Sequence, residues 1–585
     1  MARFWNLLYM IQRAPAGKMK RCAILLFTLF ISTSVFSQVT PTPQGQRATD
    51  SLNRSDTLKV VQILSANRYG FKRIDSLTEL LLMVGNVALK QGTTTFYADS
   101  TVYNRRDRVV ESFGHVHIND NDSIHTYSDY LLYHTTPKIA FLNKNVRLTD
   151  GKSNLYTEEL EYDVNNKIGI YRQGGKVVNG TSVLTSNEAT YYADIKDVYF
   201  RGNVKLKDPQ YDLEADSLLY NTTNEIATFI TETKIVDSAK RTIVTSEGFY
   251  DLKNKFASFG KRPVITDGPM TIIANQIDTD DNTGISILTG SAIFRDTAQG
   301  VSVLANSIVS NRITGSMVAT EKPVMIIKQE NDSTFISADT LYSGRLSDLP
   351  DTTGSAGVED SSKIAGDTSA GSEQITNVST RASLQKDRTT ATNANDSADR
   401  YFKAYFNVRI FSDSLQAVCD SLFYSGKDSI FRLFREPIVW SGASQVTGDT
   451  IYMYTKNKKP NQLYVFENGL MVNKTGENMY NQVKGNRIYG YFTEGEIDYI
   501  RSKGNAESIY YAKDEQEKII GVNKATSDII DMRFKNKELN RVVFISAVTG
   551  TMLPLRQASE EDTRLRSFQW HEAKRPKTKF ELIGN

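Results

Sequence analysis

The chain has 585 residues, of which 40% are hydrophobic and 10% aromatic, so it is long enough for several domains or for one extended array with a packed core. Its formal charge at pH 7 is +3, and the first 37 residues carry five basic residues and no acidic residue. The remainder is therefore close to neutral, which gives no electrostatic case for a nucleic-acid partner.

Residues 1–37 have the organisation of a secretory signal peptide. A basic segment ending at Arg21 precedes an apolar run from Cys22 to Phe36, and small residues suitable for cleavage lie just before Gln38. The run is short for a membrane span. We therefore expect it to be removed on export rather than kept as an anchor.

Removal of this segment leaves Cys419 as the only cysteine, whether translation begins at Met1 or at Met19. An exported chain with one cysteine forms no internal disulfide, so strand pairing and burial must hold it together. Residues 38–58 are polar and include two prolines. We expect them to form a flexible lead-in.

From about residue 59 a short motif returns roughly every 30 residues. Leu213–Tyr220 is one copy, Ala98–Tyr103 is another, and Tyr127–Tyr133 is a third. A small residue, an acid or amide, and a tyrosine keep their order, and the alternation of polar and apolar residues favours a strand. The acid or amide falls at Asn67, Asp99, Asp129, Glu158, Glu188, Asp216, Glu247, Asn275, Asn306, Asp339, Asp420, Asp449, Asn486, Glu507 and Asp528. Such a period predicts a stack of one supersecondary unit.

A second motif lies between the copies of the first. Gly85–Leu89 reads GNVAL, Gly114–Ile118 reads GHVHI, and Gly202–Leu206 reads GNVKL. Apolar residues two positions apart share one face of a strand, and the residue between them faces the other way. Each repeat therefore predicts two strand segments with one apolar and one solvent-facing side, preceded by Gly/Asn turns.

Residues 347–399 interrupt the repeats. They are rich in Ser, Thr, Ala, Gly and Asp and contain no aromatic residue, so we expect disorder. The 30-residue period is kept when most of this segment is left out, which indicates a loop inserted into one repeat. We expect repeats over residues 59–346 and 400–555 that form a nearly continuous stack. Residues 556–585 mix both charge signs and form either a docking tail or a frayed end.

The motifs of common enzymes are missing. The sequence contains no HExxH, GxSxG, P-loop or paired CxxC motif. We therefore expect no enzyme activity, no catalytic residue and no cofactor. Cys419 is most simply a buried small residue.

Three histidines form the one group that resembles a metal site. His115 and His117 lie two residues apart and would share a strand face, and His125 follows nearby. No fourth ligand is evident, so we favour solvent-facing histidines on an exposed strand and predict no metal.

The recurring acid has two interpretations. Carboxylates stacked along an array can hold Ca²⁺ or act as acids. However, asparagine takes the place at Asn67, Asn275, Asn306 and Asn486. A hydrogen-bonding role at a turn tolerates that exchange, whereas a general acid does not. We therefore favour the structural role.

The signal segment and the two motifs, A-D-x-x-x-Y and G-N-V-x-L, together resemble the OstA-like family. This family includes the periplasmic lipopolysaccharide-transport bridge protein LptA and the N-terminal domain of its outer-membrane partner LptD. The resemblance covers most of residues 60–350 and, less regularly, residues 400–550. It implies an all-β fold, an elongated, twisted β-jelly roll in which antiparallel strands stack as a V.

The resemblance also implies a function. Family members hold the acyl chains of lipopolysaccharide between two apolar sheet faces and join end to end through exposed sheet edges. Each buried acyl CH₂ contributes about 0.8 kcal/mol. Carried over to this sequence, the candidate groove lining is Val87, Leu89, Val116, Ile118, Val146, Leu148, Val204, Leu206, Val324, Ile326, Val408, Ile410, Ile438 and Trp440.

The implied partners are lipopolysaccharide or a related glycolipid, other lipopolysaccharide-transport proteins at the inner and outer membranes, and further copies of this chain. The implied location is the periplasm, with association with the outer membrane as the alternative. Two features depart from the family: the chain is much longer than the bridge protein, and residues 347–399 have no counterpart. Two rival interpretations remain, an extracellular β-solenoid that binds or processes polysaccharide and a structural surface protein with a closed core.

Overall fold

The computed structural model describes residues 60–328, 332–349, 399–456, 459–493, 496–514, 516, 518–535 and 538–583. The predicted signal segment (1–37), the predicted lead-in (38–58) and nearly all of the predicted disordered insert (347–399) lie outside these ranges. The described residues, all of which follow Lys59, form one compact unit.

The described residues are almost entirely β-structure, as the repeats predict. The strands of the first part are β1 (Gln62–Ser65), β2 (Arg68–Arg73), β3 (Glu79–Gln91), β4 (Thr94–Asn104), β5 (Val109–Asp120), β6 (Ile124–His134), β7 (Ile139–Thr149), β8 (Ser153–Asp163), β9 (Ile168–Tyr171), β10 (Gly175–Asn179), β11 (Ser182–Ser186), β12 (Glu188–Tyr192), β13 (Asp197–Lys207), β14 (Tyr211–Asn221), β15 (Ile226–Phe229), β16 (Thr233–Asp237), β17 (Thr242–Thr245), β18 (Glu247–Asp251), β19 (Phe256–Gly260) and β20 (Val264–Asp267).

The strands of the second part are β21 (Met270–Ile273), β22 (Gln276–Asp280), β23 (Ile285–Asp296), β24 (Val301–Asn311), β25 (Ser316–Thr320), β26 (Val324–Lys328), β27 (Ser333–Ser337), β28 (Thr340–Arg345), β29 (Arg400–Phe411), β30 (Gln416–Ser425), β31 (Ile430–Phe434), β32 (Ile438–Ser441), β33 (Ser444–Thr447), β34 (Thr450–Lys456), β35 (Lys459–Gly476), β36 (Met479–Thr493), β37 (Glu496–Lys513), β38 (Ile519–Lys535), β39 (Glu538–Ile545) and β40 (Thr549–Pro554). The helical elements are short: η2 (Leu346–Asp348), α2 (Glu560–Thr563), η4 (Glu572–Lys574) and α3 (Phe580–Ile583). No helix among the described residues has the length and apolar character needed to cross a membrane.

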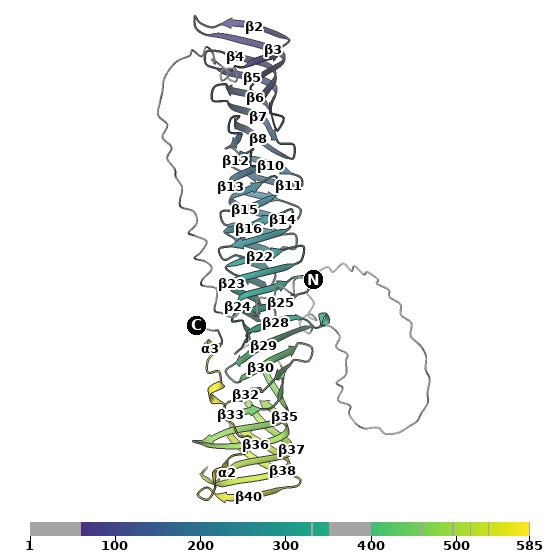
Figure 1. Cartoon of the computed structure of the whole chain (residues 1–585), viewed down its shortest axis with the longest axis vertical. Helices are drawn as coiled ribbons and strands as arrows, with labels where there is room; N and C mark the ends of the chain where they lie inside the picture. Colours follow the sequence, from purple (N-terminus) through teal and green to yellow (C-terminus); the bar gives the residue numbers. More distant parts are fainter. Residues whose placement is uncertain are drawn as a thin grey trace, which may run out of the picture. The chain divides into compact units, whose positions relative to one another are not determined.

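Each pass of the chain belongs to two sheets. The Leu218–Asn221 half of β14 pairs with β15, and the Tyr211–Ala215 half pairs with β16. We call the sheet that contains the first half wall A and the sheet that contains the second half wall B. All the strand pairs are antiparallel, and successive strands stack in chain order from β2 to β40 (Figure 1).

The two walls meet at a corner, where the pairing between full-length strands is interrupted. In β13 the pairing with β14 stops at Arg201 and resumes at Val204. The two residues between them, Gly202 and Asn203, have φ angles of +73° and +49°. This left-handed pair forms a β-bulge that bends the strand from wall A into wall B.

The recurring acid or amide supports the corner. At the Gly114–His115 corner, a Cβ added to Gly114 would lie 2.3 Å from the carboxylate of Asp99, and His115 Nδ1 lies 2.8 Å from the same Asp99 Oδ2. Asn145 Nδ2 donates in the same way to Asp129 Oδ2 at 2.7 Å. The predicted hydrogen-bonding role of these acids is therefore confirmed at these corners.

The same contact recurs far along the chain. Asn407 donates to Asp339 and Asn468 donates to Asp449, both at 2.9 Å. In one repeat the corner residue is Asn187, whose N–H donates to the Gly202 carbonyl, rather than the aligned Glu188.

The space between the walls is filled by one continuous apolar core. Alternate residues of both walls face inward, and the buried cluster runs from Leu81 near the first strands to Phe534 in β38. Because each repeat contributes the same inward positions, the core continues without a boundary from one repeat to the next.

The stack also continues across the insert. β28 pairs directly with β29, from Thr340 opposite Tyr405 to Arg345 opposite Arg400. The two ends of the insert are tied together, because Ser347 Oγ donates to Asp399 Oδ2 at 2.7 Å. The ladder of paired strands is therefore unbroken between the two blocks of repeats.

The C-terminal tail returns along the outer face of wall B. Three buried glutamines of this face, Gln482, Gln445 and Gln416, bond to the tail at Leu565, at His571 and at Arg575, respectively. Leu565 and Leu582 are 5% exposed. The tail is therefore docked, and this settles the choice that the sequence left open between a docked and a frayed end.

We expect Gln445→Ala to release the tail. Gln445 is fully buried, accepts hydrogen bonds from Trp440 Nε1 and the His571 N–H, and donates to the Gln569 carbonyl. Its loss leaves the buried Trp440 Nε1–H and two backbone groups of the tail, the His571 N–H and the Gln569 carbonyl, without this partner, which costs about 1–3 kcal/mol. Limited trypsin digestion should then cleave at Arg566, where the parent chain resists. Gln276→Ala, at an exposed glutamine, is the control, and equal resistance of both variants contradicts the prediction.

The His115 corner should depend on pH. The hydrogen bond to Asp99 and its charge raise the pKa of His115 above its ordinary value of 6.5. A raised pKa means that the contact stabilises the corner fully below pH 6.5 and that this contribution is lost as the pH rises through the folded-state pKa. NMR titration should show a lower His115 pKa in Asp99→Asn. An unchanged pKa contradicts the contact.

Candidate functional site

Most of the predicted groove lining faces the core between the walls. Ten of the fourteen residues belong to the continuous core, and none is more than 2% exposed. They are Val87, Leu89, Val116, Ile118, Val146, Leu148, Val204, Leu206, Val408 and Ile410.

Four predicted lining residues lie on the opposite face of wall B. Val324 and Ile326 flank Met325, and Ile438 and Trp440 flank Val439; Met325 and Val439 are the core residues. In both strands a proline takes the first inward position after the corner, so the apolar pair that follows is one residue out of step. A one-residue slip turns a side chain to the other face. Trp440 is instead buried beneath the tail, where its Nε1 donates to Gln445.

Opposite the corner, the free ends of the two walls meet at what we call the mouth. A tyrosine near the wall A end of one strand bonds to a polar residue at the wall B end of a strand 41 or 42 residues earlier. The pairs are Tyr133 with Gln91 at 2.6 Å, Tyr162 with Asp120 at 2.9 Å, Tyr191 with Asp150 at 3.1 Å, and Tyr220 with Asn179 at 3.0 Å. We call these four contacts the latches.

The latch tyrosines are buried. All four tyrosines are at most 4% exposed. Burial raises the pKa of Tyr220 to about 12 and raises the pKa of Tyr162 and Tyr191 as well, where the nearby carboxylates add to the effect. The hydroxyls therefore stay protonated at neutral pH and act as hydrogen-bond donors to Asp120 and Asp150.

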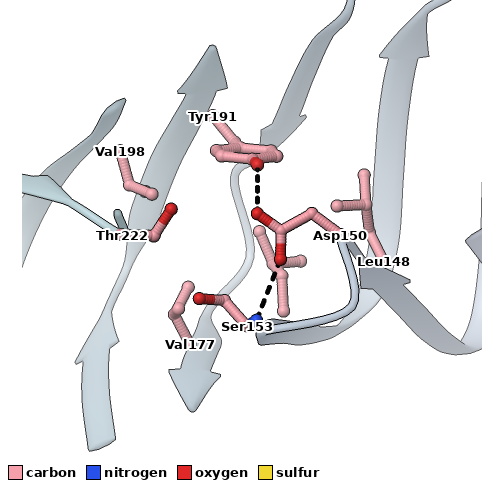
Figure 2. A pocket seen from close by; sticks show the side chains of 8 residues that line it. Leu148, Asp150, Ser153, Val177, Tyr191, Val198 and Thr222 are labelled. Carbon is pink, nitrogen blue, oxygen red and sulfur yellow. Dashed lines mark hydrogen bonds between the residues drawn. The ribbon is translucent and has the colours of Figure 1, made fainter. Parts of the chain in front are cut away.

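One latch has additional partners. Burial alone would raise the pKa of Asp150, but hydrogen bonds from the backbone N–H groups of Ser153 and Lys152, together with the charge of Lys196, lower it. Asp150 is therefore a carboxylate that accepts bonds from both walls. The Tyr191 and Ser153 contacts are drawn in Figure 2.

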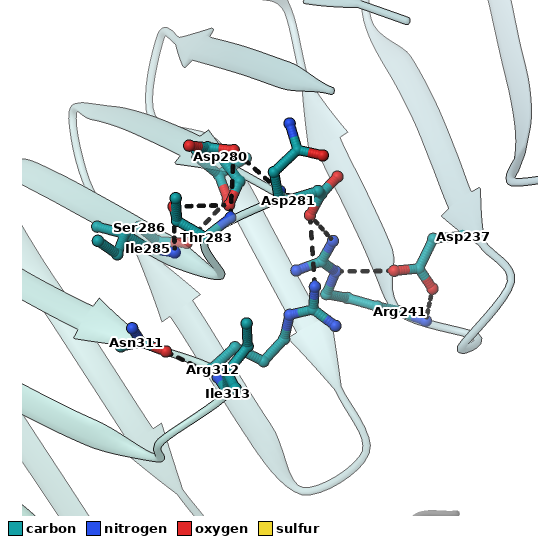
Figure 3. Close-up of polar contacts among 12 residues, drawn as sticks. Asp237, Arg241, Asp280, Asp281, Thr283, Ile285, Ser286, Asn311, Arg312 and Ile313 are labelled. Carbon is teal, nitrogen blue, oxygen red and sulfur yellow. Dashed lines mark hydrogen bonds and ion pairs between the residues drawn. The ribbon is translucent and has the colours of Figure 1, made fainter. Parts of the chain in front are cut away.

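In the repeats after Tyr220, a cluster of ion pairs joins the two walls at the mouth. Arg241, in the turn after β16, lies 3.0 Å from Asp237 Oδ2 of its own turn and 3.3 Å from Asp281 Oδ1 at the wall A end of β22 (Figure 3). Arg312 approaches the same Asp281 oxygen at 3.6 Å, and Tyr211 donates to Asp281 Oδ2 at 2.8 Å. The charges balance locally, and the walls are joined across the mouth.

The interior beneath the latches has little free space. Directly under the Tyr191–Asp150 latch lies a cavity of about 10 Å³, lined on its apolar side by Leu148, Val177 and Val198 (Figure 2). This is room for about one water molecule. The inward side chains here pack against one another.

The other candidate groups do not converge. His115 lies in a corner beside Asp99, while His117 Nε2 lies 3.1 Å from His125 Nδ1 on wall B, so the corner separates the first histidine from the other two. No group of three or more potential metal ligands occurs in the part of the chain that the structure describes. Burial raises the pKa of the Cys419 thiol to about 12, which keeps it protonated and unreactive.

The polar partners in the latches, Gln91, Asp120, Asp150 and Asn179, are functional candidates that the sequence patterns do not single out. They read as ordinary turn residues at strand ends. The signal in the sequence that could point to the latches is the tyrosine of the first motif, because it recurs with the period of the repeat.

We expect Tyr162→Phe to loosen the mouth locally. The change leaves Asp120 Oδ2, on a residue that is 3% exposed, without the Tyr162 donor, at a cost of about 1–2 kcal/mol. Amide hydrogen exchange of β5 and β8 should accelerate. Tyr199→Phe is the matched control, because Tyr199 is 38% exposed on the outer face of wall A. Equal exchange in the two variants contradicts the role of the latch.

Comparison with known proteins gives a family match and a structural similarity. Residues 59–216 match the family model described as OstA-like protein. The crystal structure of LptH, the LptA homologous periplasmic component of the conserved lipopolysaccharide transport device from Pseudomonas aeruginosa, is 14% identical to the chain, covers 26% of this chain and 98% of its own, and has a TM-score of 0.14. At these values the similarity carries no argument about function. No curated protein matches the chain. The predicted resemblance to the OstA-like family is thus confirmed over residues 59–216.

Proposed function

We propose that the protein is a periplasmic bridge that carries lipopolysaccharide or a related glycolipid toward the outer membrane. The observation that supports this most directly is the unbroken apolar core between two walls, which runs from Leu81 to Phe534 behind a polar mouth. Acyl chains would replace the packing of inward side chains, and the polar headgroup would remain outside the mouth.

Burial of an acyl chain can outweigh the loss of a latch. One latch contributes about 0.5–1.5 kcal/mol, whereas ten acyl methylenes moved out of water contribute roughly 8 kcal/mol before binding costs. An acyl chain that enters also covers the apolar surface that separation of the walls exposes. The lipid itself can therefore hold the mouth open over the repeats that it occupies.

Movement follows from the repetition of these contacts. Because the latches recur at nearly equal spacing, a lipid that advances by one repeat opens the next latch while the latch behind it closes. The free energy changes little from one position to the next. Binding and mobility are thus combined without covalent chemistry, which agrees with a protein that is not an enzyme and uses no cofactor.

The ends of the stack suit association with other proteins. β1 and β2 pair only with β3 among the described strands, and Tyr69 and Phe71 of β2 are 70% and 55% exposed. An unpaired apolar sheet edge favours strand addition. It would pair with further copies of this chain or with lipopolysaccharide-transport proteins at the inner and outer membranes. Export through the predicted signal segment would place the chain in the periplasm.

The filled interior favours one alternative, a structural surface protein with a permanently closed core. In that case the latches would be fixed connections and would never open to a lipid. The two functions differ in what the inward residues touch in the cell.

Photo-crosslinking from the core in intact cells distinguishes them. A photoreactive residue at Val146 or Leu206, both inward and at most 2% exposed, should label the glycolipid. The same residue at Arg147 or Lys205, on the outer face of the same strands, should not. Labelling from neither inward position contradicts transport and supports the closed structural protein, and equal labelling from both faces contradicts a groove between the walls.

A further inference from the structure

The character of the mouth changes along the stack. Where the early repeats place Tyr133, Tyr162, Tyr191 and Tyr220, the later repeats place Thr279, Ser310 and Ser343. Two residues further toward the wall A end, small or apolar residues give way to Asp281, Arg312 and Arg345. In the middle of the chain, the side chains at the first of these positions are therefore smaller, and those at the second position are charged.

Arg345 and Arg400 face the mouth side by side. They are direct cross-strand partners of β28 and β29. Two residues inward from them lie Ser343 and Phe402, and two further inward lie Leu341 and Ala404 of the core. Side chains two apart share a face, so both arginines are on the inner face of wall A, at its rim.

These two arginines face each other as like charges. Like charges directly opposite one another destabilise a sheet. Arg400 Nη1 donates to the Gly315 carbonyl at 2.7 Å, but both Nε–H groups are buried without a partner. No carboxylate among the described residues forms an ion pair with either one. The neighbouring mouth arginines differ, because Arg241 and Arg312 both reach Asp281.

Both guanidinium groups lie close to Gly315, which has no side chain to cover them. Gly315 directly precedes β25 and lies opposite Arg345 of β28. A Cβ at Gly315 would lie 3.4 Å from Arg345 Nε and 3.4 Å from Arg400 Nη1. Two guanidinium groups that converge on a glycine offer forked donors to an oxyanion, and phosphate suits that geometry.

We propose that Arg345 and Arg400 form a phosphate-binding site at the mouth, which holds a phosphate group of an acylated lipid whose tails lie between the walls. The proposal rests on the proposed function for the source of the phosphate. The site would be a resting position at mid-stack, since the four latches of the early repeats contain no arginine and the Arg241 cluster is already neutralised by its own aspartates.

Binding of three probes to the purified full chain tests the site. The probes are bis-phosphorylated lipid A, the same lipid after removal of its phosphates, and inorganic phosphate. The parent chain should prefer the phosphorylated lipid by about tenfold to a hundredfold. The double variant R345Q/R400Q should lose that preference and still bind the dephosphorylated lipid. R345K/R400K, which keeps both charges without the fork, should retain part of it.

The control K322Q/K403Q removes two charges from an exposed corner and from the outer face of wall A, and it should behave as the parent chain. Unchanged hydrogen exchange of β28 and β29 checks folding. A preference that survives in R345Q/R400Q, or lipid binding without any preference in the parent chain, overturns the site and leaves the groove intact. Binding of neither lipid by the parent chain contradicts the proposed function instead. If the parent chain then binds inorganic phosphate and R345Q/R400Q does not, the two arginines form a site for free phosphate. If the parent chain does not bind phosphate, the site is overturned as well.

Discussion

The bend between wall A and wall B is the constraint on which the rest of the structure depends. Two consecutive residues with positive φ, such as Gly202 and Asn203, let one strand serve two sheets without losing its antiparallel neighbours. The acid or amide of the adjacent strand then accepts or donates a hydrogen bond at the bend. Because every full-length strand bends at the same place, the inward positions of both walls align from repeat to repeat and bury one shared core.

The opposite side of the molecule is held by weaker and more varied contacts. The corner is covalent backbone, whereas the mouth is closed by single hydrogen bonds from tyrosines and, further along, by the Arg241–Asp281 ion pair. No disulfide crosses the mouth in the described residues, whose free cysteine is buried. The fold is thus joined through the backbone on one side and held by non-covalent contacts on the other.

Sequence patterns account for the fold and for most of the core, and the exceptions have physical causes. The period of about 30 residues and the alternation of GNVxL predict the strands and their order. Ten of the fourteen residues predicted to face inward do so. Val324, Ile326, Ile438 and Trp440 fail because a proline after the corner shifts the alternation by one residue. The same alternation gave no indication that the outer face of wall B is apolar where the tail covers it.

Sequence patterns did not predict the contacts at the mouth, for a different reason. A latch joins residues 41 or 42 positions apart on different walls, and neither partner is unusual by itself. Asp120 reads as a turn residue and Tyr162 as a sheet residue, until the bend places their side chains opposite each other. The Arg345–Arg400 pair lies on the two sides of an insert and becomes a pair only because the ladder continues beneath it.

The returning tail has a consequence for how the molecule assembles. The described strands pair with neighbours at most three strands away in the chain, so structure can grow step by step from the first strand as the polypeptide emerges. The tail alone makes contacts over distances such as 126 residues at Gln445 and 172 residues at Arg409. It is synthesised last and binds only to strands that are already paired. A premature stop would therefore spare the order of the stack but leave the apolar back of its final third uncovered, in a form prone to adhere to other chains.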